Sequence, residues 1–345
     1  DTINVGSNAN GTLTSPQANS NGTLDDIDAL LTVDGNAPAS GSDYLIIDDT
    51  GDTTSNAGTL TDTTLTGLGL SASGITYTAI EHLVISLGDG GNTFTIDSTH
   101  GAATNNYAEE TILNTGGGAD TVNINDVTDT LVVNGEGGTD VINVNGTGSG
   151  SNSTLNGDDS NDIFNIRAID GATTINAGNG ADTINIGSNA QGVIGDADNN
   201  SNGTLNAISA LLTVNGNGTG TERDLLKVDD TADTLDNTGV LTNSRLTGLG
   251  MGSSDQSVVN ASLGIDYSDI EDLLISLGSG ADNYTIDSTH NSATATTETT
   301  TVNVGSGTDT IVINDASDIL TVIGEADADT INVNGTSLGS VVTLN

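Results

Sequence analysis

The chain has 345 residues with 47 acidic and four basic side chains, which gives a formal net charge of −43 at neutral pH. Such a polyanion repels nucleic-acid phosphate and has no basic patch to bind it, so no nucleic-acid partner is expected. The absence of cysteine excludes disulfides and cysteine-type zinc sites. No run is apolar enough to cross a membrane as a helix, so no membrane span is expected.

Acidic composition with 2% aromatic residues is also typical of disordered chains, which is the first alternative to weigh. The placement of the apolar residues argues against disorder. Ile, Val and Leu stand mostly in short alternating runs between glycine-rich turns. The sequence therefore predicts a folded chain of short β-strands.

A long internal repeat divides the chain. DTINVGSNA at Asp1–Ala9 returns as DTINIGSNA at Asp182–Ala190, and the segment Gly22–Gly35 returns in similar form at Gly203–Gly216. The offset is 181 residues in both cases. We expect a first module at 1–181 and a second, incomplete module at 182–345, both belonging to a longer tandem array.

A shorter period lies inside each module and is marked by glycine-rich turns that close with Asp. Steps of 20, 22 and 20 residues separate the first four of these aspartates. The second and fourth residues after each Asp are apolar and the residue between them is usually polar, which places the apolar pair on one face of a strand. A second short strand follows in most repeats. The turns close at Asp120, Asp140, Asp162, Asp182, Asp282, Asp309 and Asp329, with Asn92 as a variant.

This pattern predicts an all-β fold, a right-handed parallel β-solenoid or β-roll built from coils of about 20 residues. Each coil would bury its apolar face only when neighbouring coils stack on it. The segments Leu24–Val33 and Leu205–Val214 are ambiguous, because Leu24, Ile27, Leu30 and Leu31 fit a short helix as well as a strand. We interpret these segments as short helices.

The turns are candidate ion sites. Glycines allow sharp turns with positive φ that aim carbonyl oxygens inward, and the closing Asp adds a carboxylate. Calcium takes six to eight oxygen ligands of these kinds and suits the turns better than magnesium, which demands a rigid octahedron. We therefore predict several Ca²⁺ ions per chain, with the eight closing residues as ligands and with three further aspartates inside the turns, Asp89, Asp158 and Asp327, as additional candidates.

The turns resemble the RTX or hemolysin-type calcium-binding repeat, G-G-x-G-x-D-x-U-x with U apolar. The match is good at the fourth, sixth and eighth positions and weak at the first, where Thr115, Ala177, Leu277 and Val304 stand. The resemblance implies that the closing aspartates bind calcium. The coils are longer than two nonapeptides, however, so the ion row would be interrupted or use other oxygens. The whole module also resembles the long β-strand repeats of giant bacterial cell-surface proteins.

The alternative is that each Asp only caps its turn with its own side chain. Electrostatic repulsion argues against this alternative. Stacked carboxylates a few ångströms apart repel one another, and the chain has almost no Lys or Arg to neutralise them. Further acidic pairs occur at Asp48 with Asp49, Asp229 with Asp230, Asp126 with Asp129, and Asp315 with Asp318. We interpret these pairs as a solvated acidic face rather than as ligands.

The sequence does not favour a catalytic function. Asp287, Ser288 and His290 have the residue types of a hydrolase triad, as do Asp97, Ser98 and His100, but neighbours on one strand point to opposite faces. A polysaccharide lyase on a β-helix would need clustered Arg or Lys. We expect a protein that is not an enzyme.

Ten N-x-S/T sequons and hydroxyl-rich segments such as Thr147–Thr154 and Ser292–Thr301 suit either glycan attachment or adhesion, and that choice stays open. The sequons begin at Asn10, Asn21, Asn145, Asn152, Asn199, Asn202, Asn217, Asn260, Asn283 and Asn334.

The resulting hypothesis is a calcium-stabilised structural repeat protein of a bacterial cell-surface layer, extracellular filament or matrix. Such a protein would lie outside the cell or on its surface and would associate with itself, head to tail or laterally, because open solenoid ends expose strand edges. Surface glycans are a further possible partner. The alternative is the calcium-stiffened stalk of a large secreted adhesin or RTX-type protein.

Overall fold

The computed structural model describes residues 1–12, 15, 20–36, 42–101, 108–197, 201–217, 222–252, 263–290 and 297–345. Within these residues all regular structure is β-strand and there is no helix, so the expected all-β class is confirmed. Contacts divide the chain into two compact units, residues 1–159 and 160–345, which are described separately below. The sequence modules are defined by repeated residues rather than by contacts and stay a prediction.

In the first unit the chain passes back and forth between two sheets. The β3 sheet has the order β1-β3-β7-β9-β11-β13 and the β10 sheet has the order β2-β6-β5-β4-β8-β10-β12. The strands are β1 (Thr2–Val5), β2 (Leu31–Asp34), β3 (Tyr44–Asp48), β4 (Ala57–Leu60), β5 (Thr64–Gly67), β6 (Ile75–Thr78), β7 (His82–Ser86), β8 (Thr93–Ile96), β9 (Glu110–Asn114), β10 (Thr121–Ile124), β11 (Thr130–Asn134), β12 (Val141–Val144) and β13 (Asn152–Asn156).

The second unit has the same plan. The β17 sheet has the order β15-β17-β21-β20-β19-β23-β25-β27, and the β22 sheet has the order β14-β16-β18-β22-β24-β26-β28. The strands are β14 (Ile163–Ile166), β15 (Ala172–Asn176), β16 (Thr183–Ile186), β17 (Leu211–Asn215), β18 (Leu225–Asp229), β19 (Thr238–Leu241), β20 (Arg245–Gly248), β21 (Gly264–Ser268), β22 (Asp272–Ser276), β23 (Asn283–Ile286), β24 (Thr299–Asn303), β25 (Thr310–Ile313), β26 (Ile319–Ile323), β27 (Thr330–Val333) and β28 (Val341–Leu344).

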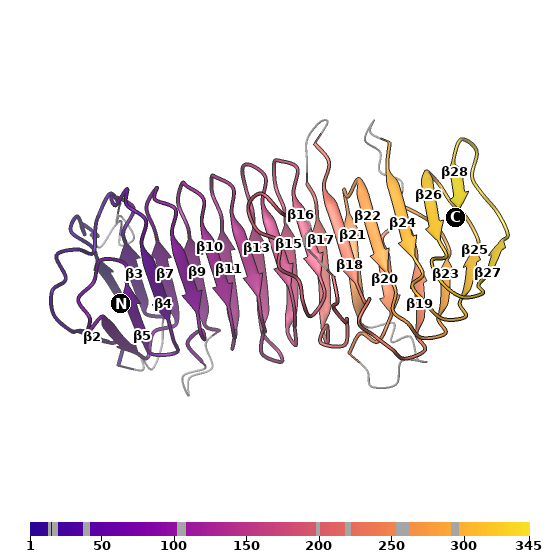
Figure 1. Cartoon of the computed structure of the whole chain (residues 1–345). Helices are drawn as coiled ribbons and strands as arrows, with labels where there is room; N and C mark the ends of the chain where they lie inside the picture. Colours follow the sequence, from indigo (N-terminus) through magenta and orange to yellow (C-terminus); the bar gives the residue numbers. More distant parts are fainter. Residues whose placement is uncertain are drawn as a thin grey trace. The chain divides into compact units, whose positions relative to one another are not determined.

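The alternation of apolar and polar residues explains both the strands and the core between the two sheets of a unit. In β11, Leu131 and Val133 are fully buried while Val132 between them faces outward. Parallel pairing keeps equivalent positions in register, so Val133 lies beside Leu113 of β9 and Leu155 of β13. Figure 1 shows the arrows of such neighbouring strands lying side by side and pointing the same way. This arrangement, mostly parallel and wound between two sheets, is consistent with a β-solenoid.

Each unit contains one antiparallel excursion that the sequence analysis did not predict. In the first unit β4, β5 and β6 pair antiparallel inside the β10 sheet. The reversal after β4 is closed by a backbone bond from Thr61 N–H to Thr64 O and by a bond between their hydroxyls. Gly58 of β4 has no side chain because the ring of Phe94 lies against it, where a Cβ would approach within 2.7 Å. In the second unit β19, β20 and β21 form the same excursion.

The helices expected at Leu24–Val33 and Leu205–Val214 are wrong. Ile27 N–H donates to Leu24 O in a single turn, and the chain then enters β2. Ile208 and Leu205 form the same turn ahead of β17. A helix would bury Leu24 and Leu30 on one face, but Leu24 is fully buried and Leu30 is 54% exposed. A turn anchored by one buried leucine therefore replaces the helix.

Neighbouring valines on β11 test the in-register core. We expect Val133→Ala to lower the free energy of unfolding by about 2 kcal/mol or more, because it removes two buried methyl groups and leaves a cavity. The matched control, Val132→Ala, faces outward and should cost roughly 0.5 kcal/mol or less. Urea denaturation followed by circular dichroism measures both. Equal losses for the two variants would contradict the assigned faces.

Candidate functional site

The candidate site is a series of side-chain ladders in the turns. Each closing residue stands directly before a strand, and all of them are buried except Asp329, which is half-buried. Its side-chain oxygen accepts a hydrogen bond from the backbone N–H of the closing residue in the neighbouring turn. In the first unit Asn56 N–H donates to Asn92 Oδ1 (2.9 Å), Asn92 N–H to Asp120 Oδ1 (2.5 Å), and Asp120 N–H to Asp140 Oδ1 (2.8 Å). These turn amides have no partner in a strand, so the side chains satisfy donors that would otherwise be buried without a partner.

The second unit has two such ladders. In one, Asp162 N–H donates to Asp182 Oδ1 (2.7 Å), and Asp182 N–H donates to Asp224 Oδ1 (2.9 Å). In the other, Asp282 N–H donates to Asp309 Oδ1 (2.8 Å), and Asp309 N–H donates to Asp329 Oδ1 (3.1 Å). The structure thus places seven aspartates that the sequence predicted, and Asn92, at equivalent ladder positions.

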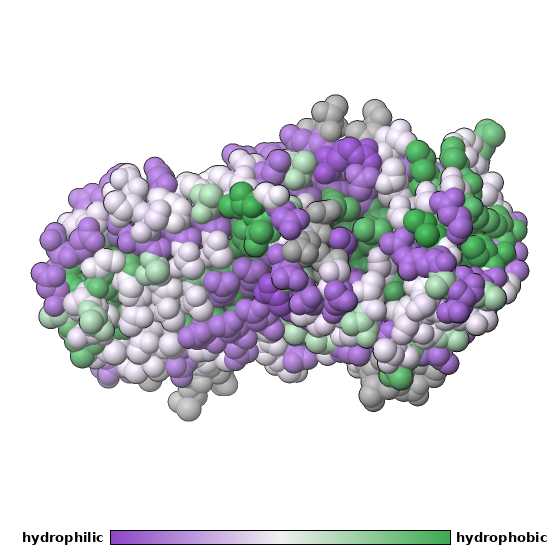
Figure 2. Space-filling view, in the orientation of Figure 1, coloured by the Kyte–Doolittle hydropathy of each residue, from purple (hydrophilic) through white to green (hydrophobic). Residues whose placement is uncertain are grey.

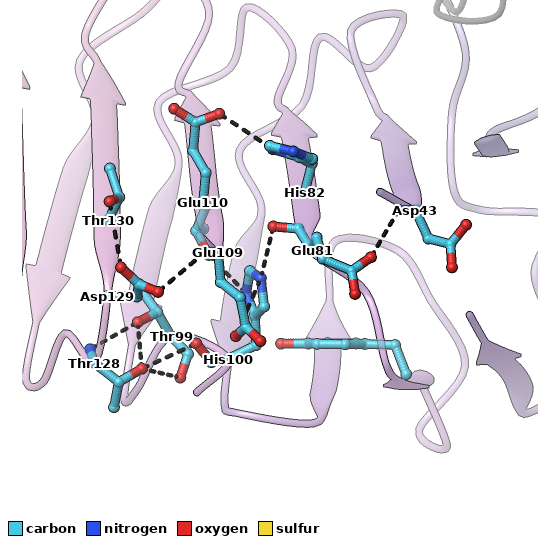
Figure 3. A network of polar contacts seen from close by, with 12 residues as sticks. Asp43, Glu81, His82, Thr99, His100, Glu109, Glu110, Thr128, Asp129 and Thr130 are labelled. Carbon is cyan, nitrogen blue, oxygen red and sulfur yellow. Dashed lines mark hydrogen bonds and ion pairs between the residues drawn. The ribbon is translucent and has the colours of Figure 1, made fainter. Parts of the chain in front are cut away.

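The opposite row of turns carries ladder members that the sequence analysis missed. Asp43 N–H donates to Glu81 Oε2 (2.7 Å), and Glu109 N–H donates to Asp129 Oδ2 (3.1 Å). Figure 3 shows these four side chains in succession along one side of the β3 sheet. The second unit has the matching residues Glu271, which accepts from Asp224 N–H, and Asp318, which accepts from Glu298 N–H. Their signal was an acidic residue immediately before an alternating strand, without the glycine-rich turn.

The second carboxylate oxygen of several ladder aspartates is buried and has no hydrogen-bond partner. This holds for Oδ2 of Asp182, Asp224, Asp282 and Asp309, whose side chains are at most 1% exposed. At Asp224 this oxygen lies under Gly216, the first residue of the turn, where a Cβ would come within 2.4 Å. The ladder bond therefore uses one oxygen of these four carboxylates and leaves the other buried, at Asp224 against a glycine where a side chain would not fit.

Burial raises the pKa of several ladder carboxyl groups above the ordinary value of 3.8. The pKa rises to about 6 at Asp120 and Asp182, where the ladder bond and, at Asp120, the Thr115 hydroxyl oppose the rise. Burial, with repulsion from neighbouring carboxylates, raises the pKa of Asp140, Asp224 and Asp282 to about 7. Negative charge on the ladder carboxylates therefore destabilises the fold near neutral pH unless a proton or a bound cation neutralises it.

The three additional candidates lie on the outside of the turns. Asp89, Asp158 and Asp327 are exposed. Asp158 Oδ2 accepts the Glu136 N–H (3.1 Å) and Asp327 Oδ2 accepts the Gly307 N–H (3.3 Å). Asp158 and Asp120 both add repulsion that raises the pKa of Asp140, so the outer carboxylate and the ladder share one electrostatic environment.

The solvated acidic face expected at Asp48, Asp49, Asp229 and Asp230 is wrong, because all four side chains are at most 2% exposed. They bind the backbone of a preceding loop. Asp48 Oδ2 accepts Gly22 N–H (2.8 Å) and Asp49 Oδ1 accepts Leu24 N–H (3.0 Å). The other two expected pairs, Asp126 with Asp129 and Asp315 with Asp318, are half-buried.

A group of neighbouring carboxyl groups in the second unit surrounds Asp230. Burial, together with repulsion from Asp233 and Asp282, raises the pKa of Asp230 to about 8. Asn237 joins the group, because its Nδ2 donates to Asp230 Oδ2 (3.2 Å) and its N–H donates to Asp282 Oδ1 (2.7 Å). The equivalent place in the first unit holds Asn92 instead of Asp282 and so carries less charge.

Within the described part of the chain, no three or more His, Cys, Asp or Glu side chains are grouped in a way that could hold a metal ion. A cation at the ladders would therefore draw on single carboxylate oxygens of neighbouring turns together with other oxygens, such as turn carbonyls.

The residues resembling a hydrolase triad make other contacts. His100 Nδ1 bonds to the Thr111 hydroxyl (3.1 Å) and its Nε2 lies 3.3 Å from Glu81 O, while its ring packs edge-on against Tyr77. Asp97 Oδ1 accepts from Asn125 Nδ2 (2.8 Å). His290 repeats these contacts with Thr300, Glu271 O and Tyr267. Two of the sequons, at Asn199 and Asn260, and part of the Ser292–Thr301 segment lie outside the described residues.

Comparison of the chain with protein-family models, with curated proteins and with solved structures finds no match. Among the described residues no helix has the length and apolar character needed to span a membrane.

The raised pKa values predict an unusual dependence of stability on pH. A carboxyl group whose folded-state pKa exceeds its unfolded value stabilises the fold fully below the unfolded pKa, and that stability is lost as pH rises through the folded pKa. For Asp140, Asp224 and Asp282 this window runs from 3.8 to about 7. In chelator we therefore expect the melting temperature to fall by several degrees between pH 5 and pH 8.

The double variant Asp224→Asn, Asp282→Asn should show a shallower pH dependence, because an amide keeps the oxygen acceptor of the ladder but takes up no proton. Thermal melts followed by circular dichroism at fixed ionic strength measure both proteins. A melting temperature that rises from pH 5 to pH 8 in chelator would show that the buried carboxyl groups do not control stability.

Proposed function

We propose that this protein is a calcium-stabilised structural repeat protein of a bacterial cell-surface layer, extracellular filament or matrix. In this proposal the two-sheet architecture is a right-handed parallel β-solenoid, or β-roll, with coils of about 20 residues. The protein would act outside the cell as a structural element rather than as an enzyme.

One observation carries the proposal: buried ladder carboxylates stand one strand spacing apart, about 4.8 Å, in a chain that has 47 acidic and only four basic side chains. Arg223 pairs with Asp272 (2.6 Å) and Arg245 pairs with Asp266 (2.8 Å). Both aspartates lie outside the ladders. Burial raises the pKa of the ladder residue Glu271 and Arg223 opposes that rise, but four basic side chains leave most of the acidic charge unbalanced. Cations from solution would supply the missing charge.

Calcium suits these turns best among common cations. It is a hard ion that accepts carboxylate and carbonyl oxygens in flexible geometry, which matches turns that combine buried carboxylates with backbone carbonyl groups. The resemblance to RTX repeats supports the same ion. We propose as ligands the predicted residues Asn92, Asp120, Asp140, Asp162, Asp182, Asp282, Asp309 and Asp329, with Asp89, Asp158 and Asp327 from the outer turns and Asp224 added from the ladder geometry.

The strands β27 and β28 carry exposed apolar side chains. The apolar side chains of Val333, Val341 and Leu344 are 45–53% exposed there, and Leu338 in the loop between them is fully exposed. Figure 2 shows apolar surface gathered where these strands lie. The sequence Asp329–Val333, DTINV, is identical to Asp1–Val5. The proposed self-association, end to end or lateral, rests on the general tendency of open solenoid strand edges to pair with further strands.

The second candidate function is the calcium-stiffened stalk of a large secreted adhesin or RTX-type protein. An outward-facing pocket on the β3 sheet, described below, favours it, because a purely structural element needs no such pocket. Surface glycans would then be the partner.

Removal of calcium tests the first proposal. We expect calcium to raise the melting temperature well above that in chelator, because each site saturated tenfold adds about 1.4 kcal/mol of stability. Circular dichroism and light scattering would follow folding and association as calcium is removed and restored, with magnesium at equal ionic strength as the control. Identical melting curves in chelator and calcium would leave the aspartates as turn formers only.

Asp282→Asn separates calcium binding from turn capping. The amide keeps the Oδ1 acceptor for Asn237 N–H, as Asn92 does at the equivalent position, but removes the charge. We expect an unchanged or higher melting temperature in chelator and a smaller increase on adding calcium. Asp287→Asn, on an exposed side chain, is the matched control and should keep the full increase. An equal response of the two variants would remove Asp282 from the ligand set.

A further inference from the structure

A second feature lies on the outer face of the β3 sheet, away from the ladders. Side chains of β3, β7 and β9 that point away from the core line a cavity of about 410 Å³. This volume falls within the range of roughly 300–1,000 Å³ that is usual for small-molecule sites. Binding sites of that size combine apolar or aromatic walls with a few polar groups, and the cavity has both.

One end of the cavity is an aromatic pair with a carboxylate. The rings of Tyr44 and His82 stack with centroids 4.4 Å apart and planes 13° from parallel. His82 Nδ1 lies 3.4 Å from Glu110 Oε2, and Figure 3 shows this pair at the outer edge of the strands. The three residues are direct neighbours in the strand register, so one row across the sheet presents a flat ring, an imidazole and an acceptor.

The floor and the other end follow from the same register. Ile46, Val84 and Ile112 form the next outward row and give an apolar strip. Beyond it, Asn114 Nδ2 donates to the Ser86 hydroxyl (3.0 Å) and Asn114 Oδ1 accepts from Asn134 Nδ2 (2.7 Å), so the rim offers the second N–H of Asn114 and the Ser86 hydroxyl proton. The cavity is therefore apolar along its middle and hydrogen-bonding at both ends.

The second unit shows that this set is not needed for the fold. Its equivalent row across β18, β22 and β24 is Leu225, Asp272 and Thr299, paired in the same register. There Arg223 forms two bonds to Asp272, through Nε (2.9 Å) and Nη2 (2.6 Å). Ser276 and Asn303 keep the Ser–Asn bond, at 3.2 Å. The aromatic pair and the glutamate are thus special to the first unit, on a face where packing does not require them.

We propose that this outward cavity on β3, β7 and β9 binds a neutral carbohydrate. A sugar ring has one apolar C–H face and hydroxyls around its edge, which fits an apolar strip and stacked rings between two polar ends. Carboxylate and amide groups recognise vicinal hydroxyls by paired hydrogen bonds. Glu110 and the net charge of −43 disfavour anionic sugars. This site is independent of calcium, because none of its residues belongs to a ladder.

The test uses the full chain and four neutral disaccharides, cellobiose, N,N′-diacetylchitobiose, lactose and maltose. Saturation-transfer NMR would detect binding and isothermal titration would measure it. We expect at least one to bind, and Tyr44→Leu and Glu110→Thr, which install the residues of the second unit, to weaken that binding at least tenfold. Far-UV circular dichroism should be unchanged, since the same fold already accepts both residues.

Two controls complete the experiment. Thr301→Ala on the outer face of β24 should leave binding unchanged. Glu110→Gln keeps an oxygen acceptor and should lose less affinity than Glu110→Thr. The proposal is overturned if none of the four sugars binds, if binding survives Tyr44→Leu, or if Thr301→Ala weakens it equally. Binding of an acidic disaccharide in place of the neutral ones would also overturn it.

Discussion

The structure depends on a hydrogen bond that crosses from one turn to the next. In most of the ladders the residue that closes the turn is buried, yet its N–H does not join the hydrogen bonds of the sheet, and an unpaired buried N–H would cost about 1–3 kcal/mol. A side-chain oxygen of the following turn accepts that bond, as Asp140 does for Asp120 and Asp309 does for Asp282. The requirement explains why short acidic or amide side chains close the turns.

The solution creates an electrostatic problem of its own. A carboxylate has two oxygens and the ladder uses one, so the second is buried with its share of the charge. Asn92 shows that an amide meets the hydrogen-bonding requirement without that charge, which means that the bond alone does not explain the preference for Asp. Carboxylates in excess of this hydrogen-bonding requirement are expected if cations or protons bind between neighbouring layers. The proposed role of calcium follows from that excess.

Much of the fold and half of the site could be predicted from the sequence. Alternation after each turn located strands such as β10 and β12, because period two leaves a clear trace when only one face is buried. The antiparallel excursion of β4 to β6 could not be predicted, since strands of either direction alternate in the same way. The helix predicted from Leu24 and Leu30 was wrong because helical spacing of leucines does not show which of them is buried. Glu81 was missed because no glycine-rich turn precedes it, and Asp224 because three residues, not one, separate it from the last glycine of its turn, although both accept the same kind of N–H.

The burial of Asp48 and Asp230 could not be predicted from the sequence either. A pair of adjacent aspartates is usually exposed, and only the structure shows the loop whose backbone N–H groups donate to these side chains. The pocket on the β3 sheet could not be predicted for a related reason. Tyr44, His82 and Glu110 are far apart in the chain and meet only through the register of three strands.

Every ladder bond described above runs the same way along the chain, with the donor earlier in the sequence than the acceptor. The two sides of a turn therefore require different hydrogen-bonding groups from the neighbouring layers. A following layer must bring a side chain with an acceptor at one fixed position, whereas a preceding layer needs only a backbone amide, which any residue except proline supplies. The stack of turns therefore has a direction: the layer that follows must supply a side-chain acceptor, whereas the layer that precedes needs only a backbone N–H. Insertions such as the antiparallel excursions are accommodated only where the next layer again supplies that acceptor.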